Sequence, residues 1–228
     1  MKKLLIISMA LGIAAGANAQ FVIRGTFNGW GGGGDVAMTD MGGGHWQGTI
    51  TGLTAGDRHE FKVTTTDWSN NGPTDNARFM VGSSGQVLVN FWENAAADGW
   101  LPSTGKRVGY SNDNAHNWEI MGAFNGWSAP VVGLSHLGSG LYEGTVALTA
   151  GTYEYKFRKE NDWDISINND FSNYGGNITT TIAADGLYKF SLDLQNGRHN
   201  LTAVPEPATM AILGLGVAAM IRRRARKA

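Results

Sequence analysis

Phe124-Asn125-Gly126-Trp127 is the stretch that decides the fold, because the same four residues occur earlier as Phe27-Asn28-Gly29-Trp30. The two copies lie 97 residues apart (124 − 27). A self-match at a fixed spacing indicates a repeated unit, and the repeat must be recognised before the fold is assigned. Upstream residues align at the same spacing and at alternate positions, which is the period of a half-buried β-strand: Phe21, Ile23 and Gly25 align with Trp118, Ile120 and Gly122.

The Asn-Gly dipeptide inside each copy favours a tight turn, because both residue types accept positive φ. The strand is therefore expected to end there, with the tryptophan directly after the turn. Each copy predicts a strand, a sharp turn and an aromatic side chain at the edge of a sheet.

A second pair of matching segments lies downstream, where Glu60-Phe61-Lys62-Val63 aligns with Glu154-Tyr155-Lys156-Phe157. Alternation places the aromatic and aliphatic residues on one face of the strand and the lysines on the other. Asp67-Trp68 and Asp162-Trp163 follow these strands.

Short strands that recur about every ten residues, with no amphipathic helix between them, predict an all-β protein. We expect two tandem immunoglobulin-like β-sandwiches, each large enough for its own core. The predicted organisation is a first sandwich in 20–110, a linker in 111–117 and a second sandwich in 118–204. Residues 93–105 are expected to form a long loop of the first sandwich, pinned by Trp100-Leu101-Pro102.

Composition limits the function. The formal net charge is −1, but seven basic residues lie at the two ends of the chain. Without them and Glu206, residues 20–204 hold 11 basic and 18 acidic residues, a net charge of −7. An acidic body without a basic stripe argues against nucleic acid as a partner. The chain contains no cysteine, which excludes disulfides and thiolate metal sites.

The N-terminus has the pattern of a secretory signal peptide. Lys2-Lys3 precede an apolar run over 4–16, and small residues at 17 and 19 predict cleavage after Ala19. Residues 1–19 are therefore expected to direct export and to be removed. The alternative, a buried N-terminal helix, fits the charge and small-residue pattern less well.

The C-terminus contains Val204, Pro205, Glu206 and Pro207, an apolar run over 208–221 and a basic cluster in 222–227 that includes Arg222, Arg223 and Arg224. A helix of the apolar run would span roughly 21 Å, short of the ~30 Å hydrocarbon core. The cluster would stay cytoplasmic by the positive-inside rule, with the body outside.

This C-terminal pattern resembles the PEP-CTERM sorting signal of Gram-negative, exopolysaccharide-producing bacteria. The resemblance implies processing by an exosortase-like enzyme, transient anchoring of residues 205–228 in the inner membrane, and delivery to the cell surface or extracellular matrix. A plain C-terminal membrane anchor is the alternative.

The repeated segments, in particular 123–128 and 153–157, resemble the glycogen-binding module of AMP-activated protein kinase β subunits and the starch-binding modules of isoamylases and pullulanases. In that family two tryptophans support α-glucan rings, and a lysine and an asparagine bond to sugar hydroxyls. The resemblance implies that Trp127, Lys156, Trp163 and Asn177 bind carbohydrate in the second repeat. It implies the same role for Trp30, Lys62 and Trp68 in the first, where no partner for Asn177 is evident.

The residue types agree with this hypothesis, since flat aromatic rings cover the apolar face of a sugar while a few donors and acceptors bind its rim. The alternative is that these tryptophans are core residues, which is the commoner role in a β-sandwich. We expect Trp46 and Tyr142 to be core, and no cofactor or metal site. Asp162, Asp164 and Asp170 could ligate calcium, but hydrated loop carboxylates are the simpler interpretation.

Three functions are consistent with the sequence. The first is an exported, non-catalytic protein that binds α-glucan or a related exopolysaccharide. The second is a structural or adhesion protein of the matrix, with the sandwiches as spacers. The third, a glycoside hydrolase, needs two carboxylates across a cleft, and only Asp162 and Asp164 suggest such a pair.

Overall fold

A computed structural model of the chain describes residues 21–94, 98–102, 106–111, 117–128, 130–169, 171–172 and 176–205. These residues form an all-β fold, which confirms the predicted fold class. The predicted signal peptide (1–19), the apolar run (208–221) and residues 112–116 of the predicted linker lie outside the described residues. Among the residues that the structure describes, no helix is long and apolar enough to cross a membrane.

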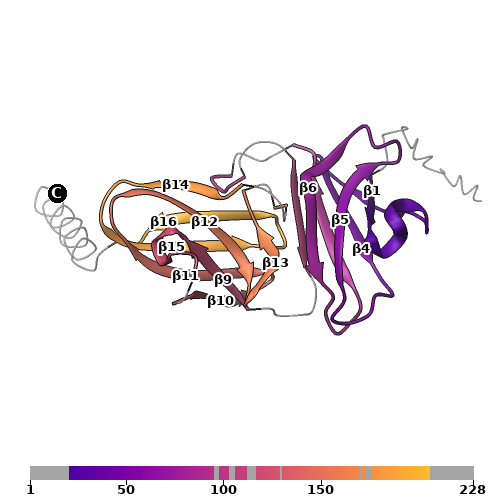
Figure 1. Cartoon of the computed structure of the whole chain (residues 1–228). Helices are drawn as coiled ribbons and strands as arrows, with labels where there is room; N and C mark the ends of the chain where they lie inside the picture. Colours follow the sequence, from indigo (N-terminus) through magenta and orange to yellow (C-terminus); the bar gives the residue numbers. More distant parts are fainter. Residues whose placement is uncertain are drawn as a thin grey trace, which may run out of the picture.

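The elements follow one another in two groups (Figure 1). The first group is β1 (Phe21–Gly25), the 3-10 turn η1 (Thr26–Gly31), β2 (Val36–Ala37), β3 (Thr39–Gly42), β4 (His45–Ile50), β5 (Arg58–Thr65), β6 (Asn71–Met80), β7 (Val87–Trp92) and β8 (Arg107–Ser111). The second group is β9 (Trp118–Gly122), the 3-10 turn η2 (Ala123–Asn125), β10 (Val132–Gly138), β11 (Leu141–Leu148), β12 (Gly151–Lys159), β13 (Asp162–Ile167), β14 (Ile178–Ile182), β15 (Gly186–Asp193) and β16 (Arg198–Ala203).

The first sandwich consists of two four-stranded sheets, with strand orders β2-β1-β5-β6 and β3-β4-β7-β8. The second is one continuous sheet in the order β13-β12-β9-β10-β11-β15-β16, with β14 also paired to β12. The difference arises at β10, which pairs with β9 at one end and with β11 at the other. In the first sandwich the stretch of chain that corresponds to β10 forms two short strands, β2 and β3, with Met38 between them. The Met38 N–H donates a hydrogen bond to the Phe21 carbonyl. The antiparallel pairing pattern is otherwise the same in the two sandwiches.

Alternation along the strands builds the core, as predicted. Phe61 and Val63 of β5 are fully buried, and so are Val87, Val89 and Phe91 of β7. In β12, Tyr155 and Phe157 are buried while Lys156 between them is only half-buried. Trp46 and Tyr142 are buried, in agreement with their predicted core role. Burying one such large side chain contributes about 1.5–3 kcal/mol.

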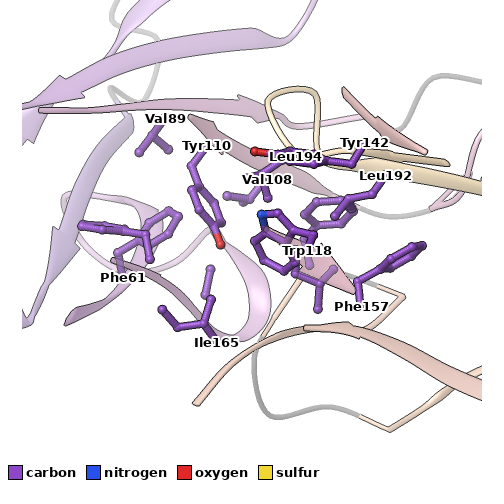
Figure 2. Packing of buried hydrophobic residues seen from close by; sticks show 14 of the residues in the cluster. Phe61, Val89, Val108, Tyr110, Trp118, Tyr142, Phe157, Ile165, Leu192 and Leu194 are labelled. Carbon is purple, nitrogen blue, oxygen red and sulfur yellow. The ribbon is translucent and has the colours of Figure 1, made fainter. Parts of the chain in front are cut away.

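The two cores are continuous across a seam between the sandwiches (Figure 2). Tyr110 of β8 lies at this seam, where its ring packs edge-on against Phe61 at 5.9 Å and its backbone N–H bonds to the Leu194 carbonyl. Gly109, its neighbour, lies against the backbone of Gln195 and Gly197. On the side of β6 and β13, which lie next to each other in Figure 1, the Arg58 guanidinium pairs with the carboxylates of Asp162 and Asp164.

The segment 98–102 also joins the two sandwiches. Leu101 and His199 of β16 exchange two backbone hydrogen bonds, of 2.8 and 2.6 Å. Asp98 accepts hydrogen bonds from both Arg107 and Arg198. The sequence predicted that Trp100-Leu101-Pro102 pins a loop of the first sandwich. The structure shows that this segment pairs with an edge strand of the second, and edge strands expose unpaired backbone groups unless they are covered.

His199 is fully buried among the rings of Tyr155, Phe157 and Phe171. Neither ring nitrogen has a hydrogen-bond partner among the residues described. Burial disfavours the charged imidazolium, so the pKa of His199 is lowered from 6.5 to about 4.

We expect this histidine to make the fold sensitive to mild acid. Between pH 6.5 and 4 the unfolded chain binds a proton on His199 that the folded chain does not, so the free energy of unfolding falls as the pH falls. The loss between pH 7 and pH 5 should be about 2 kcal/mol. Urea unfolding at the two pH values measures it. His199→Phe, which keeps a ring among the aromatic neighbours, should reduce the pH dependence; an unchanged slope in this variant would assign the effect to other groups.

Candidate functional site

Each Phe-Asn-Gly-Trp segment forms a 3-10 turn that reverses the chain after the first strand of its sandwich. The positive-φ residues are Gly29 and Trp30 (57° and 59°), and Gly126 and Trp127 (61° and 59°). The sequence placed the positive φ on Asn and Gly, one residue too early, and Asn28 in fact has φ −125°. The glycine therefore provides the turn, and the tryptophan after it is held in a left-handed conformation that bulky residues rarely adopt.

The asparagine closes the turn with its side chain. The Oδ1 atom of Asn28 accepts the Gly25 N–H at 2.9 Å, and that of Asn125 accepts the Gly122 N–H at 3.0 Å. The amide nitrogen of Asn28 donates to the Gly34 carbonyl and that of Asn125 to the Pro130 carbonyl. These side-chain hydrogen bonds satisfy backbone groups at the point where the hydrogen bonds between strands end.

The second tryptophan of each sandwich follows the strand that carries the lysine. Trp68 also has positive φ (64°), in a turn where the Asp67 carboxylate accepts hydrogen bonds from the Thr65 hydroxyl and from Ser69. These hydrogen bonds, of which the one from Thr65 contributes most, lower the pKa of Asp67 to about 2. Trp163 lies at the start of β13, where Asp162 accepts the backbone N–H of Asp164.

The turns bring the four predicted tryptophans together in two pairs. Pair one, Trp30 and Trp68, has ring centroids 6.4 Å apart and ring planes inclined by 41°. Pair two, Trp127 and Trp163, has centroids 6.1 Å apart and an inclination of 44°. Trp68 is 40% exposed and Trp163 44%, while Trp30 and Trp127 are half-buried. Each pair therefore offers aromatic surface to solvent.

An arginine supports the second ring of each pair. The Arg24 guanidinium lies 5.0 Å from the Trp68 ring centroid, and that of Arg158 lies 4.4 Å from the Trp163 centroid. Arg24 forms two hydrogen bonds with Asp35, whose pKa the guanidinium lowers, and Arg158 pairs with buried Glu119. A cation over an indole face contributes about 0.5–2 kcal/mol and fixes the ring. The sequence did not predict these arginines, because one comes from β1 and the other from β12.

The polar candidates lie on the same sheets as the pairs. Lys62 donates to the Thr74 carbonyl at 2.6 Å, and Lys156 is half-buried, so that its pKa is lowered by desolvation. Asn177 is exposed and donates to the Glu154 carboxylate at 3.0 Å.

The register supplies a counterpart of Asn177 that the sequence did not reveal. Ala77 pairs with Phe61 and Ile178 pairs with Tyr155, so Asn76 and Asn177 each directly precede the residue that pairs with the matching aromatic residue. Asn76 donates to the Glu60 carboxylate at 2.8 Å, as Asn177 does to Glu154. Asn76 lies 14 residues after Lys62 and Asn177 lies 21 after Lys156, and this difference in length hides the match.

We expect backbone strain at the turn tryptophans to reverse the usual preference for alanine over glycine. A bulky residue at φ near +60° costs about 1–2 kcal/mol, which glycine avoids. Trp127→Gly should therefore be about 1 kcal/mol more stable than Trp127→Ala. Trp163, which has no positive φ, is the matched control, and there the glycine variant should be the less stable one. Thermal and urea unfolding of the four variants test this, and the same order at both positions would contradict it.

Comparison with known protein families identifies a sorting signal at the C-terminus. Residues 203–227 match the PEP-CTERM protein-sorting motif. This range contains all the residues predicted for sorting, from Val204 to Arg224, and confirms that resemblance. The chain is therefore an exported protein that is sorted to the cell surface, and exosortase-like enzymes process such signals. The match includes no residue of either tryptophan pair. No curated protein matches the chain at a significant level.

The acidic residues and the tryptophans outside the two pairs make other contacts. Within the described residues, no group of three or more His, Asp or Glu side chains is arranged to hold a metal ion. Asp162 and Asp164 both pair with Arg58, and Asp170 lies outside the described residues. Trp118 is buried, while Trp92 stacks on His45 at 4.6 Å.

Proposed function

We propose that the protein is a non-catalytic carbohydrate-binding protein that holds α-glucan, or a related exopolysaccharide, at the surface of a Gram-negative bacterium. The observation that carries the proposal is the pair of tryptophans on each sandwich, in which one ring is exposed and supported by an arginine and the other is half-buried. A lysine and an asparagine–glutamate pair lie on the same sheets. Aromatic faces with a few fixed polar groups are the chemistry that sugar rings require.

The expected affinity of one pair is low. Covering about 100 Å² of one indole contributes roughly 2.5 kcal/mol before entropic costs. Two rings give a dissociation constant of about 0.1–1 mM after those costs. Two linked pairs that bind one polymer gain by effective concentration, which explains the value of two similar sandwiches.

Backbone strain at the pairs supports a functional role. Trp30, Trp68 and Trp127 are three of the six non-glycine residues with positive φ in the described part of the chain. Such conformations cost about 1–3 kcal/mol each and gather at ligand sites, where the surrounding structure enforces them. A core or spacer role gives no reason to strain indoles that are exposed or half-buried.

The inclination of the rings favours a helical glucan. The ring planes of successive pyranoses in an α-1,4-glucan are inclined to one another, whereas those in a flat β-1,4 ribbon stay nearly parallel. Ring planes inclined by 41° and 44° suit two neighbouring sugars of the turning chain.

Affinity electrophoresis of the purified mature protein tests the proposal. Glycogen or amylose in the gel should retard the protein, and added salt should change the retardation little, because stacking on aromatic rings is not screened. A cellulose derivative serves as the comparison polymer. Mobility that is the same with and without α-glucan would overturn the proposal.

The alternative is a structural or adhesion protein of the matrix. The continuous core across the seam favours it, because a rigid body suits a spacer. A catalytic role has weaker support, since Asp162 and Asp164 share one guanidinium instead of facing each other across a cleft. Release of reducing sugar by the purified protein distinguishes catalysis from binding.

A further inference from the structure

The outer face of the sheet in the first sandwich carries a continuous polar strip that begins at pair one. Lys62, Glu60 and Arg58 alternate along β5 with core residues, so their side chains share this face. Lys62 is the cross-strand neighbour of Arg24, which supports Trp68. At about 3.3 Å per residue, the strip covers roughly 13 Å from Lys62 to Arg58.

The strip ends beside pair two. Arg58 pairs with Asp162 at 2.7 Å and with Asp164 at 3.0 Å, and these two carboxylates flank Trp163 in the chain. On the neighbouring strand, Arg78 donates to the backbone carbonyl of Asp164 at 3.3 Å. The strip on β5 and β6 therefore leads from one tryptophan pair to a residue adjacent to the other.

A pocket of about 420 Å³ opens in this strip at the seam. Its walls include Thr26, Arg58, Glu60 and Arg78 of the first sandwich, and Asp164 and Ile165 of the second. Ligand pockets of proteins occupy roughly 300–1,000 Å³ and occur preferentially at domain interfaces. The volume and the position are those of a ligand site.

The charges of the pocket select a neutral ligand. Two guanidinium groups, Arg58 and Arg78, are balanced by the carboxylates of Glu60 and Asp164, and each guanidinium already has a carboxylate partner. An anionic or cationic polymer would have to displace these ion pairs. Sugar hydroxyls both donate and accept hydrogen bonds, so they can use the remaining capacity of carboxylates and guanidinium groups held in place.

We propose that this pocket is a third sugar subsite, which binds a neutral hexopyranose segment of a polysaccharide chain that runs from pair two to pair one. The proposal rests on the proposed function of the two pairs. It adds that they are not independent: one chain occupies both, and the seam binds the sugars between them.

Binding of linear maltooligosaccharides of increasing length to the mature protein, measured by titration calorimetry, tests the proposal. A short oligosaccharide reaches one pair, whereas a long one also fills the pocket. For the unmodified protein we expect affinity to rise at least tenfold when the oligosaccharide becomes long enough to enter the seam.

Asp164→Ala removes an acceptor from the pocket while Asp162 still pairs with Arg58. It should leave the affinity for short oligosaccharides unchanged and lower that for long ones about tenfold. Thr26→Val, which keeps the shape of the side chain, should act in the same direction. Asp185→Asn is the control, because Asp185 lies in the β14–β15 turn and bonds only to the Ala150 N–H among the described contacts.

The outcomes separate the two proposals. If the gain with length persists in full in Asp164→Ala and Thr26→Val, the pairs cooperate without the pocket and the third subsite is overturned. Equal losses for short and long oligosaccharides would also overturn it, because the substitution would then act on pair two. If no length binds to the unmodified protein, the proposed function itself fails. Unfolding curves of each variant show that the fold is retained.

Discussion

Trp163→Ala is expected to lower the affinity for α-glucan by about 50- to 100-fold. Trp163 has 44% of its surface exposed, and a sugar that covers about 100 Å² of it contributes roughly 2.5 kcal/mol. Because one pair binds only weakly, a loss of this size should abolish retardation in a glycogen gel when pair two dominates binding. Trp127→Ala should have a similar effect, since the two rings are 6.1 Å apart.

Stability and position both need controls in this experiment. The Trp163 ring lies over Arg158, which forms an ion pair with buried Glu119. Trp163→Ala should leave this ion pair intact, so the variant should unfold at nearly the same urea concentration as the unmodified protein. Trp92→Ala removes a tryptophan outside both pairs and should leave retardation unchanged. If Trp92→Ala weakens binding as much as Trp163→Ala, the pairs are not the binding surface.

The second large effect is expected at Gly109, which lies in β8 at the seam. A methyl group on its Cα atom would lie 2.3 Å from the Gln195 carbonyl oxygen and 2.5 Å from the Gly197 nitrogen. Both contacts are with backbone, so no side chain can move to make room. Gly109→Ala should therefore separate the sandwiches locally and break the hydrogen bond from Tyr110 to Leu194. We expect a loss above about 4 kcal/mol in the free energy of unfolding.

Gly133→Ala is the matched control for Gly109→Ala. Gly133 also lies in a strand, it has no positive φ, and no atom lies within 4 Å of the position of its missing Cβ. Its variant should be within about 0.5 kcal/mol of the unmodified protein. Urea unfolding measures both variants, and small-angle scattering shows whether Gly109→Ala lengthens the particle. Equal stability of the two variants would mean that the seam adapts to the extra carbon.

The sequence predicted most of the fold because strand alternation is a local signal. The buried residues of β5, β7 and β12 follow from a period of two, and the matching segments at Phe27 and Phe124 form the 3-10 turns η1 and η2. The pairing of Leu101 with His199 was not predicted, since these residues lie 98 positions apart (199 − 101) and no pattern links them.

The candidate site was predicted in part, for a related reason. The four tryptophans and two lysines recur at matching positions, so the repeat revealed them. Arg24 and Arg158 support equivalent rings from different strands, and therefore alignment of the two copies does not connect them. Asn76 became visible only through strand register. The turn was misassigned by one residue because the asparagine acts through its side chain and not through its φ.

Strand β16, the last that the structure describes, ends at Ala203, the residue at which the sorting motif begins. A polypeptide exported from its N-terminus delivers β16 last, and this strand completes the second sheet and receives Leu101 from the first half of the molecule. The sheet of the second sandwich is therefore complete only when the chain is present up to the start of the motif. Cleavage within the motif removes none of the described strands, whereas release of a chain that lacks β16 yields an incomplete sheet with an open edge.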